Sequence, residues 1–277
     1  MSGKTALIVL AHQERTSFNY ALKEATKAAL EKNGWTVLVS DLYEMKFNSV
    51  LSRDDITGSP KEPNNFKYGA EMLIAWQEGR LASDIKEEQK KVEKADLVIF
   101  QFPLYWFGMP ALMKGWVERV FSMGFAYSYQ AFYSEGGPFK NKRALLSFTT
   151  GGTGEMSSPR GINGDINIFL WPLQNGILNF CGFKVLEPQI SFAVAHITQE
   201  ARVEILKNWE RRLETIWDEK PIRYLPVQDF EGLSGGFVLK KEVEEARAAE
   251  KYSPTVGQHL GKPLPPDSQV KADCVRL

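Results

Sequence analysis

The stretch "ALIVLAHQERTSFNYALKEA" (residues 6–25) decides the fold, because an apolar strand turns directly into an amphipathic helix. Ser17 has the chemistry of a helix N-cap, and Phe18 and Leu22 begin a run of apolar residues at helical spacing. Such junctions in α/β proteins bind anions, because the first N–H groups of the helix are free and its dipole favours negative charge. The segment therefore predicts the first β–α unit of an α/β protein.

The turn itself, residues 11–17, contains no glycine. Neither the dinucleotide fingerprint G-x-G-x-x-G nor the phosphate loop G-x-x-x-x-G-K-S/T occurs in the chain, which removes the main support for a kinase or an ATPase. Arg15, Thr16 and Ser17 remain as candidate anion-binding groups, although Ser17 is equally explained as a simple helix cap. His12, taken alone, is more often structural than catalytic.

Apolar segments alternate with helical patterns along the chain, which predicts a parallel, doubly wound α/β sheet. The predicted strands cover residues 5–10, 35–40, 96–102, 143–149 and 184–192. Further helices are predicted over residues 68–79, 84–94, 110–121, 165–180 and 198–217. Five strands are typical of a flavodoxin-like layout, in which ligands bind beyond the carboxyl ends of the strands. The loops of interest are therefore 11–17, 103–110 and 149–164.

The C-terminal part of the chain is rich in proline and contains one charged, helix-like piece, "KKEVEEARAAEK" (240–251). A segment of this size buries little core alone, so we expect it to pack on the main domain or on a partner chain. We divide the chain into a flavodoxin-like catalytic domain, residues 1–220, and a small C-terminal appendage, residues 221–277.

Charge and cysteine content exclude several classes of protein. The 34 Lys+Arg and 34 Asp+Glu residues balance, so no basic field for nucleic acid exists. The two longest uncharged runs, 97–113 and 166–183, are interrupted by proline, glycine and amide residues, and no membrane span is expected. Cys181 and Cys274 make no disulfide framework, and the simplest location is the reducing cytoplasm.

Three segments concentrate aromatic residues or glycine. The loop "PLYWFGMP" (103–110) follows a buried strand and predicts a planar ligand or a partner surface, with packing on the sheet end as the alternative. In "TTGGTGEM" (149–156) two glycines would let backbone N–H groups approach a flat ring, with an ordinary turn as the alternative. The run "FAYSYQAFY" (125–133) predicts a subunit interface, a pocket wall, or both.

No set of side chains stands out as catalytic machinery. His12, His196 and His259 are scattered, and no acid–base pair, nucleophile elbow or Cys/His metal cluster is recognisable. An aromatic, glycine-lined site without such groups suits a cofactor that carries the chemistry itself, and a flavin is such a cofactor.

Four runs together resemble the NAD(P)H:quinone reductase family of the DT-diaphorase type, over essentially the whole chain. They are "LIVLAHQERTSFNYAL", "ADLVIFQFPLYWFGMPALMKGWVERVF", "TTGGTGEM" and "LNFCGFKVLEPQ". The resemblance implies a cytosolic, homodimeric FAD enzyme with active sites shared between the chains. It also implies that NADH or NADPH and then a quinone use one pocket in turn, so that hydride transfer is ping-pong and the hydroquinone forms in a two-electron step.

Other functions remain open beside this one. The alternatives are a sister-branch-like quinone reductase that uses dihydronicotinamide riboside, an azo or nitro reductase, and an electron carrier without turnover. A flavodoxin-like carrier would be more acidic, and it would need neither a broad aromatic pocket nor an appendage.

The resemblance implies roles for individual residues. Those expected to bind FAD are His12, Thr16, Phe18, Asn19, Ala21, Lys67, Pro103, Leu104, Tyr105, Trp106, Phe107, Glu118, Thr149, Thr150, Gly151, Gly152, Ser157 and Arg202. Those expected to line the substrate pocket are Trp106, Phe107, Tyr127, Tyr129, Gly151, Gly152, Met156, Asn163, Phe180 and Phe237. The expected catalytic positions are Gly151, Ser157 and Asn163. Partner-chain contributions are expected from Glu118, Tyr127, Tyr129 and Phe180.

The chain departs from the family pattern at several of these positions. The long branch has a tyrosine and a histidine beside the flavin where this chain has Ser157 and Asn163, and we expect the loss of that pair to slow flavin reduction. Asn163 and Tyr105 resemble the sister branch, but that branch lacks the appendage, so NAD(P)H is the expected donor. Its metal ligands correspond to Asn175 and Asn179 here, so no metal is expected.

Overall fold

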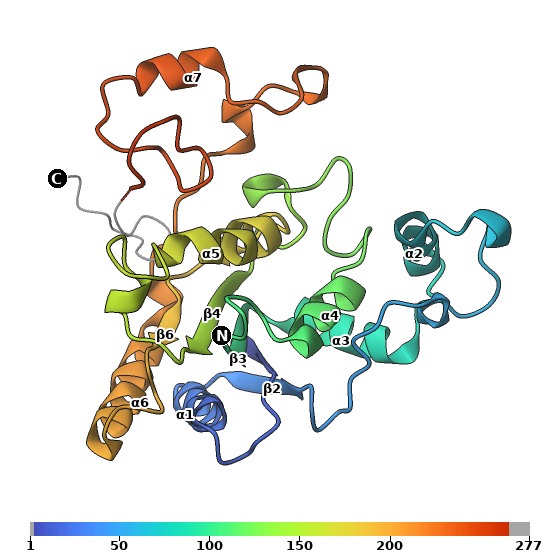
Figure 1. Cartoon of the computed structure of the whole chain (residues 1–277). Helices are drawn as coiled ribbons and strands as arrows, with labels where there is room; N and C mark the ends of the chain where they lie inside the picture. Colours follow the sequence, from blue (N-terminus) through green and yellow to red (C-terminus); the bar gives the residue numbers. More distant parts are fainter. Residues whose placement is uncertain (1–2, 266–277) are drawn as a thin grey trace.

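The computed structural model describes residues 3–265 (Figure 1). A parallel sheet lies at its centre in the strand order β2-β1-β3-β4-β5, and β6 also pairs with β4. The strands are β1 (Thr5–Leu10), β2 (Thr36–Asp41), β3 (Leu97–Pro103), β4 (Arg143–Thr149), β5 (Lys184–Val185) and β6 (Gln189–Ser191). The predicted doubly wound α/β sheet is therefore confirmed.

The predicted strand over residues 184–192 is split in two. β5 pairs with the first two residues of β4, and β6 pairs with the last three. Pro188 lies between them and has no N–H to donate to a ladder, so continuous pairing stops there. The two short strands together occupy the edge expected of one.

Helices cover both faces of the sheet (Figure 1). On one face lie α1 (Phe18–Lys32) and α6 (Gln199–Glu214), and on the other lie α3 (Ser83–Lys94), α4 (Ala111–Val120) and α5 (Ile166–Leu173). The remaining α-helices are α2 (Tyr68–Gln77) and α7 (Lys241–Ala246). Short 3-10 helices cover Arg53–Asp55, Pro63–Asn65, Ser134–Gly136, Glu155–Ser157, Ile216–Asp218, Val227–Asp229 and Leu233–Gly235.

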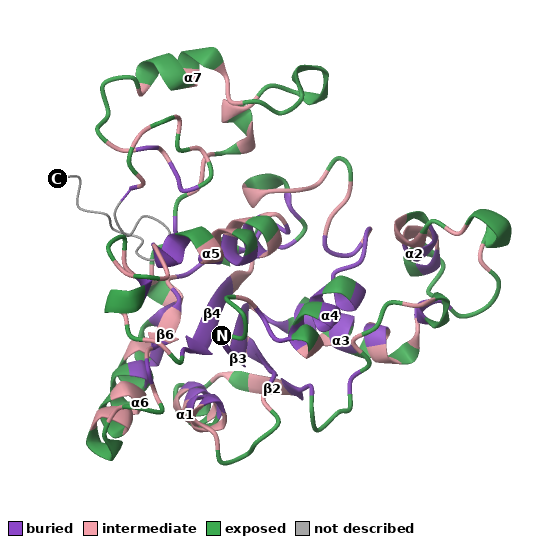
Figure 2. Cartoon of the chain, viewed as in Figure 1, coloured by how far each residue is buried: buried purple, intermediate pink, exposed green. Residues whose placement is uncertain are grey.

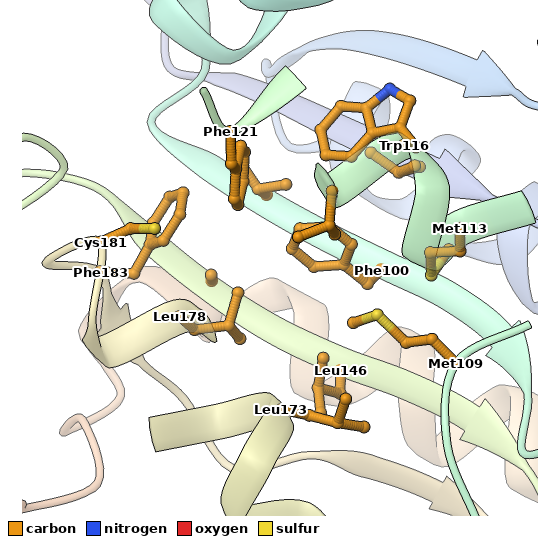
Figure 3. Close-up of a cluster of buried hydrophobic side chains, with 14 of the residues drawn as sticks. Phe100, Met109, Met113, Trp116, Phe121, Leu146, Leu173, Leu178, Cys181 and Phe183 are labelled. Atoms are coloured by element: carbon orange, nitrogen blue, oxygen red, sulfur yellow. The ribbon is translucent and has the colours of Figure 1, made fainter. Parts of the chain in front are cut away.

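Alternate residues of the central strands supply the two cores, and the strands are the most buried part of the chain (Figure 2). Along β3, Leu97 and Ile99 pack with α1 and α6, whereas Val98 and Phe100 pack with α3 and α4. In the second core, Phe100 meets the ring of Trp116 edge-on, with the ring centroids 6.0 Å apart (Figure 3). Both layers are therefore fixed by the strand pattern.

A buried ion-pair network holds the connection between β2 and α2 against α4. Arg119 donates to Asp55 Oδ1 at 2.8 Å and to Asp84 Oδ2 at 2.6 Å. The hydroxyl of Tyr68, at the start of α2, donates to Asp55 Oδ2 at 2.6 Å. A buried carboxylate needs such partners, because an unpaired one is strongly destabilising. The network fixes where the beginning of α2 lies relative to α4.

The predicted helix over residues 165–180 changes its hydrogen-bond pattern along its length. After Leu173, at the end of α5, a π-helical segment covers Gln174–Asn179, and both residues that flank this segment have right-handed helical backbone angles. The two parts together form one helical arm, which we call the α5 arm. It runs from the end of the 149–164 loop to Phe180.

The C-terminal segment packs on the α5 arm (Figure 1). Ile222 joins the core of the main sheet, and Gly257 lies so close to Trp171 that a Cβ there would come within 2.2 Å of the indole ring. The predicted helix over 240–251 is shorter, because α7 covers only Lys241–Ala246. The division of the chain at residue 220 stays a prediction, and Cys274 lies outside the described residues.

Candidate active site

The N-terminus of α1 is open toward the carboxyl edge of the sheet. Ser17 caps the helix, since its Oγ accepts a hydrogen bond from the N–H of Tyr20 at 3.2 Å. The N–H groups of Phe18 and Asn19 come earlier in the helix and have no intrahelical acceptor. Thr16 is exposed just before them. Ser17 therefore acts as the simple cap, and the helix end remains available to an anion.

His12 is half-buried at the end of β1 and is a neutral donor. Its Nδ1 accepts a hydrogen bond from the N–H of Glu14 at 3.0 Å, so the ring proton lies on Nε2. Burial lowers the pKa of His12 below its usual 6.5, and the Glu14 contact opposes this shift more weakly. Arg15, by contrast, is engaged in a surface ion pair with Glu44 at 2.8 Å.

A buried hydrogen-bond relay crosses the end of the sheet. The amide of Gln101 donates to Asn19 Oδ1, and Asn19 Nδ2 donates to Thr149 Oγ1, each at 2.8 Å. The side chain of Asn19 is thus engaged within the protein and orients the start of the 149–156 loop. Sequence reasoning missed Gln101, although a single amide in the otherwise apolar run "LVIFQF" was the available signal.

β3 and β4 end level with each other, which brings two of the predicted loops together. Pro103 and Thr149 are register partners, and the N–H of Leu104 donates to Thr149 O at 2.8 Å. The N–H of Thr150 donates in turn to Ser191 O at 3.0 Å. The segments after Pro103 and Thr149 therefore leave the sheet side by side.

A strained turn presents two aromatic rings beyond β3. Tyr105 O accepts from the N–H of Gly108 at 3.0 Å, and between them Trp106 and Phe107 have left-handed φ angles of 50° and 58°. Such angles cost about 1–3 kcal/mol for each non-glycine residue and cluster at functional sites. Trp106 is 97% exposed, and Phe107 rests on Phe169 with ring centroids 5.4 Å apart.

The glycine loop beside this turn gathers the predicted catalytic positions. Gly151 faces open space, because a Cβ there would meet no atom within 4 Å. A Cβ at Gly152 would lie 3.3 Å from Met156 Sδ and 3.7 Å from Asn163 Nδ2. Ser157 is buried in the same loop. The loop thus forms a backbone cradle with an open face.

Two further predicted cofactor residues lie near the start of a helix. Ala21 is half-buried in the first turn of α1. Arg202, in the first turn of α6, donates from Nε to Val194 O at 2.8 Å. The segment before Val194 is tied to the glycine loop, since the N–H of Ala193 donates to Gly152 O at 3.1 Å. Arg202 is therefore held beside the strand that borders the cradle.

A second group of predicted residues lines a cavity of about 790 Å³ between the main sheet domain and the C-terminal segment. Its predicted lining residues are Tyr127, Tyr129, Phe180 and Phe237. The predicted site list missed Phe132, Tyr133, Trp171, Tyr224 and Phe230 in the same wall. For Phe132 and Tyr133 the signal was present, because both belong to the aromatic run 125–133.

Phe107, beside the cradle, and Phe180, in the cavity wall, lie at opposite ends of the α5 arm. Phe169, near its start, contacts Phe107, whereas Phe180 follows its end. The helical rise between these two positions amounts to roughly 15 Å. The cavity itself extends along the arm from Trp171 to Phe180, so its far aromatic wall is distant from Phe107.

Lys67 and Glu118 occupy a third location. Lys67 is exposed before the first turn of α2, and Glu118 pairs with Lys114 at 2.5 Å on α4. Glu118 also lines a smaller cavity of about 360 Å³, which shares Tyr127 and Phe180 with the larger one. Glu118 thus lies on the same side of the molecule as the aromatic wall.

Metal-binding and membrane-spanning features are not found in the described part of the chain. The amides of Asn175 and Asn179 are hydrogen-bonded to each other, since Asn179 Nδ2 donates to Asn175 Oδ1 at 2.9 Å. Asn179 Oδ1 also accepts a hydrogen bond from Ser134 Oγ at 2.8 Å. Within residues 3–265, no group of three or more His, Cys, Asp and Glu could hold a metal ion. No helix in this range is long and apolar enough to cross a membrane.

Known proteins share both the sequence and the fold. A family described by its flavodoxin-like fold matches residues 4–213. The NAD(P)H dehydrogenase (quinone) 1 of Rattus norvegicus is 56% identical over 273 residues, which cover 98% of this chain and 99% of that protein. The chain belongs to the NAD(P)H dehydrogenase (quinone) family. The resemblance of the four sequence runs to this family is confirmed.

A shorter relative and a solved structure place the chain within the family. The ribosyldihydronicotinamide dehydrogenase (quinone) of Rattus norvegicus is 53% identical over 232 residues, which cover 84% of this chain and 100% of that protein. The present chain is thus longer than that relative. A Klebsiella pneumoniae structure, provisionally assigned as a quinone reductase, is 36% identical with a TM-score of 0.81 and covers 87% of this chain and 95% of its own.

The lowered pKa of His12 predicts that the stability of the folded protein falls as the pH falls below 6.5. The imidazole is neutral in the folded state and protonates more readily in the unfolded state, so its contribution to stability is full above pH 6.5 and is lost as the pH falls through the folded-state pKa. Denaturant unfolding between pH 7 and pH 5 should show this loss, and His12→Gln should remove that part of the slope. An NMR titration that puts the pKa of His12 at or above 6.5 would contradict the prediction.

Proposed function

We propose that this chain is an FAD-dependent NAD(P)H dehydrogenase that reduces quinones to hydroquinones by two-electron hydride transfer. The observation that supports it most strongly is the strained turn that holds Trp106 in solvent beside the open backbone of Gly151. Strained residues cluster at functional sites and exposed apolar surface marks binding sites, so a flat ligand over Trp106 would account for both features. The full-length identity to NAD(P)H dehydrogenase (quinone) 1 supports the same reaction.

The residues at the carboxyl edge fit a flavin dinucleotide. The free N–H groups at the start of α1, together with the neutral Nε2–H of His12, offer donors to a pyrophosphate. The turn 103–107 and the loop 149–152 offer a ring face and a glycine backbone. Arg202, at the start of α6, adds a cation for the adenosine side.

When bound, FAD would accept a hydride from NAD(P)H and then deliver it to a quinone, so donor and acceptor would use one pocket in turn. The chain itself would orient both reactants against the rings of Trp106 and Phe107 and would exclude water with Met156. Ser157 and Asn163 would offer neutral hydrogen bonds where the ring gains charge, since neither side chain becomes cationic at working pH.

The complete site requires a second copy of the chain. Because Phe107 and Phe180 lie at opposite ends of the α5 arm, Tyr127, Tyr129 and Phe180 of one chain would close the pocket over the cradle of its partner. Glu118, on the same side as this wall, would reach the partner's cofactor. The homodimer with shared sites is therefore part of the proposal.

The visible spectrum of the purified protein tests the function. Anaerobic NADPH should bleach a yellow flavin band, and menadione should restore it. Bleaching by dihydronicotinamide riboside alone would favour the sister-branch donor.

Gly151→Leu should lose the flavin with unchanged stability, because a Cβ there meets no protein atom within 4 Å and the rest of the side chain would extend into the space proposed for the ligand. Gly136→Leu is the matched control, also with no atom within 4 Å of the Cβ, and should stay yellow. A colourless wild-type protein that takes up no FAD would contradict the proposal.

The departures at Ser157 and Asn163 predict a slow reductive step. A lost catalytic hydrogen bond costs about tenfold to a hundredfold in rate, so Ser157→Tyr with Asn163→His should speed flavin reduction by at least tenfold in stopped flow. Ser158→Tyr changes the neighbouring residue and should leave the rate within about twofold. Equal reduction rates in the wild type and the double variant would show that the two positions are not limiting.

A further inference from the structure

The C-terminal wall of the large cavity is a hairpin over residues 229–240. Phe230 and Leu239 form an antiparallel bridge, and the N–H of Glu231 donates to Val238 O at 2.8 Å. These bonds stay inside the hairpin and do not tie it to the main sheet domain. We call this element the 229–240 hairpin.

The C-terminal segment is anchored away from the tip of this hairpin. Ile222 joins the main core, Tyr224 meets Trp171 with ring centroids 6.1 Å apart, and Gly257 packs on the same indole. Phe237 lies near the hairpin tip and lines the cavity. Within residues 3–265, one aromatic ring contact joins the hairpin to residues 1–220. It is the contact of Phe237 with Phe132, whose ring centroids are 5.7 Å apart and whose ring planes meet at 81°.

Phe132 itself is rigidly held. Its ring stacks on Phe180 at 6.1 Å and 23°, and meets Tyr133 edge-on at 5.8 Å. The N–H of Tyr133 donates to Phe180 O at 2.7 Å, and Ser134 Oγ donates to Asn179 Oδ1 at 2.8 Å. Tyr133 and Ser134 both have left-handed φ angles, of 52° and 43°, which persist only where the surroundings determine them.

Phe237 is the more exposed partner of this contact. It is 42% exposed, on a hairpin whose residues Leu233 and Val238 are also exposed. An edge-to-face ring contact is favourable beyond its buried area, so it can decide the position of a weakly held element.

We propose that Phe132 is a positioning residue that clamps Phe237 and so holds the 229–240 hairpin closed over the aromatic cavity. The closed hairpin completes the wall against which a flat substrate ring packs. The kinetic consequence rests on the proposed function, whereas the clamp itself does not. Phe132 thereby sets how firmly small quinones are retained and how large a ring system enters.

Hydrogen exchange measures the clamp directly in the flavin-loaded protein. Phe132→Ala should raise the exchange of peptides within 229–240 by about fivefold, with unchanged exchange in β1, β3 and β4. Phe132→Leu keeps an apolar side chain without the ring and should give a smaller rise. Val238→Ala, at a 63% exposed hairpin position outside the cavity lining, is the matched control and should change nothing. Unchanged hairpin exchange, or an equal rise across the whole chain, would overturn the clamp.

Steady-state kinetics measure how the clamp affects the binding and selection of quinones. Phe132→Ala should raise the KM for a one-ring quinone by about fivefold with kcat within twofold, and should raise the kcat/KM of a three-ring quinone relative to the one-ring quinone. Equal effects on both quinones would overturn the specificity role. If the wild type shows no NAD(P)H–quinone turnover, the proposed function fails, and the exchange experiment still decides the clamp. If both Phe132 variants fail to fold, Phe132 is a core residue and the proposal is wrong.

Discussion

The pairing of β3 with β4 is the constraint on which the site depends. Their parallel register runs from Leu97 opposite Arg143 to Pro103 opposite Thr149, and both strands are almost wholly buried. Because the strands end level, the aromatic turn and the glycine loop must leave the sheet together. The relay from Gln101 through Asn19 to Thr149 then adds the end of α1 to the same edge. One ladder thus assembles an aromatic turn, a glycine loop and an open helix end at the same edge of the sheet.

The α5 arm imposes the second constraint. It begins beside Phe107 and ends beside Phe180, which keeps these two rings at opposite ends of the arm within one chain. A rigid helix is a spacer, and two copies related by a twofold axis would bring each aromatic turn against the opposite cavity. The C-terminal segment supplies the outer wall of that cavity.

Much of this was predictable from the sequence, for physical reasons that differ by element. Strand and helix periodicity located the sheet, and the cap at Ser17 followed from residue chemistry. The break at Pro188 was readable in principle, because proline cannot donate to a ladder, yet the apolar run around it concealed the break. A lone amide in an apolar run marks Gln101, and an aromatic run contains Phe132, but the partners of both side chains are set by long-range packing. The individual roles of the site residues came from family resemblance and stay predictions.

Subunit complementation tests the central claim that each active site is built from two chains. One variant, Gly151→Leu, would destroy the cradle; another, Tyr127→Ala with Tyr129→Ala, would destroy the wall. A heterodimer purified through two different tags would then contain one site with both defects and one with neither. Both homodimers are expected to be nearly inactive, and the heterodimer is expected to recover about half of the wild-type turnover. A heterodimer no more active than the two homodimers would contradict that claim, because sites built within single chains would all carry a defect.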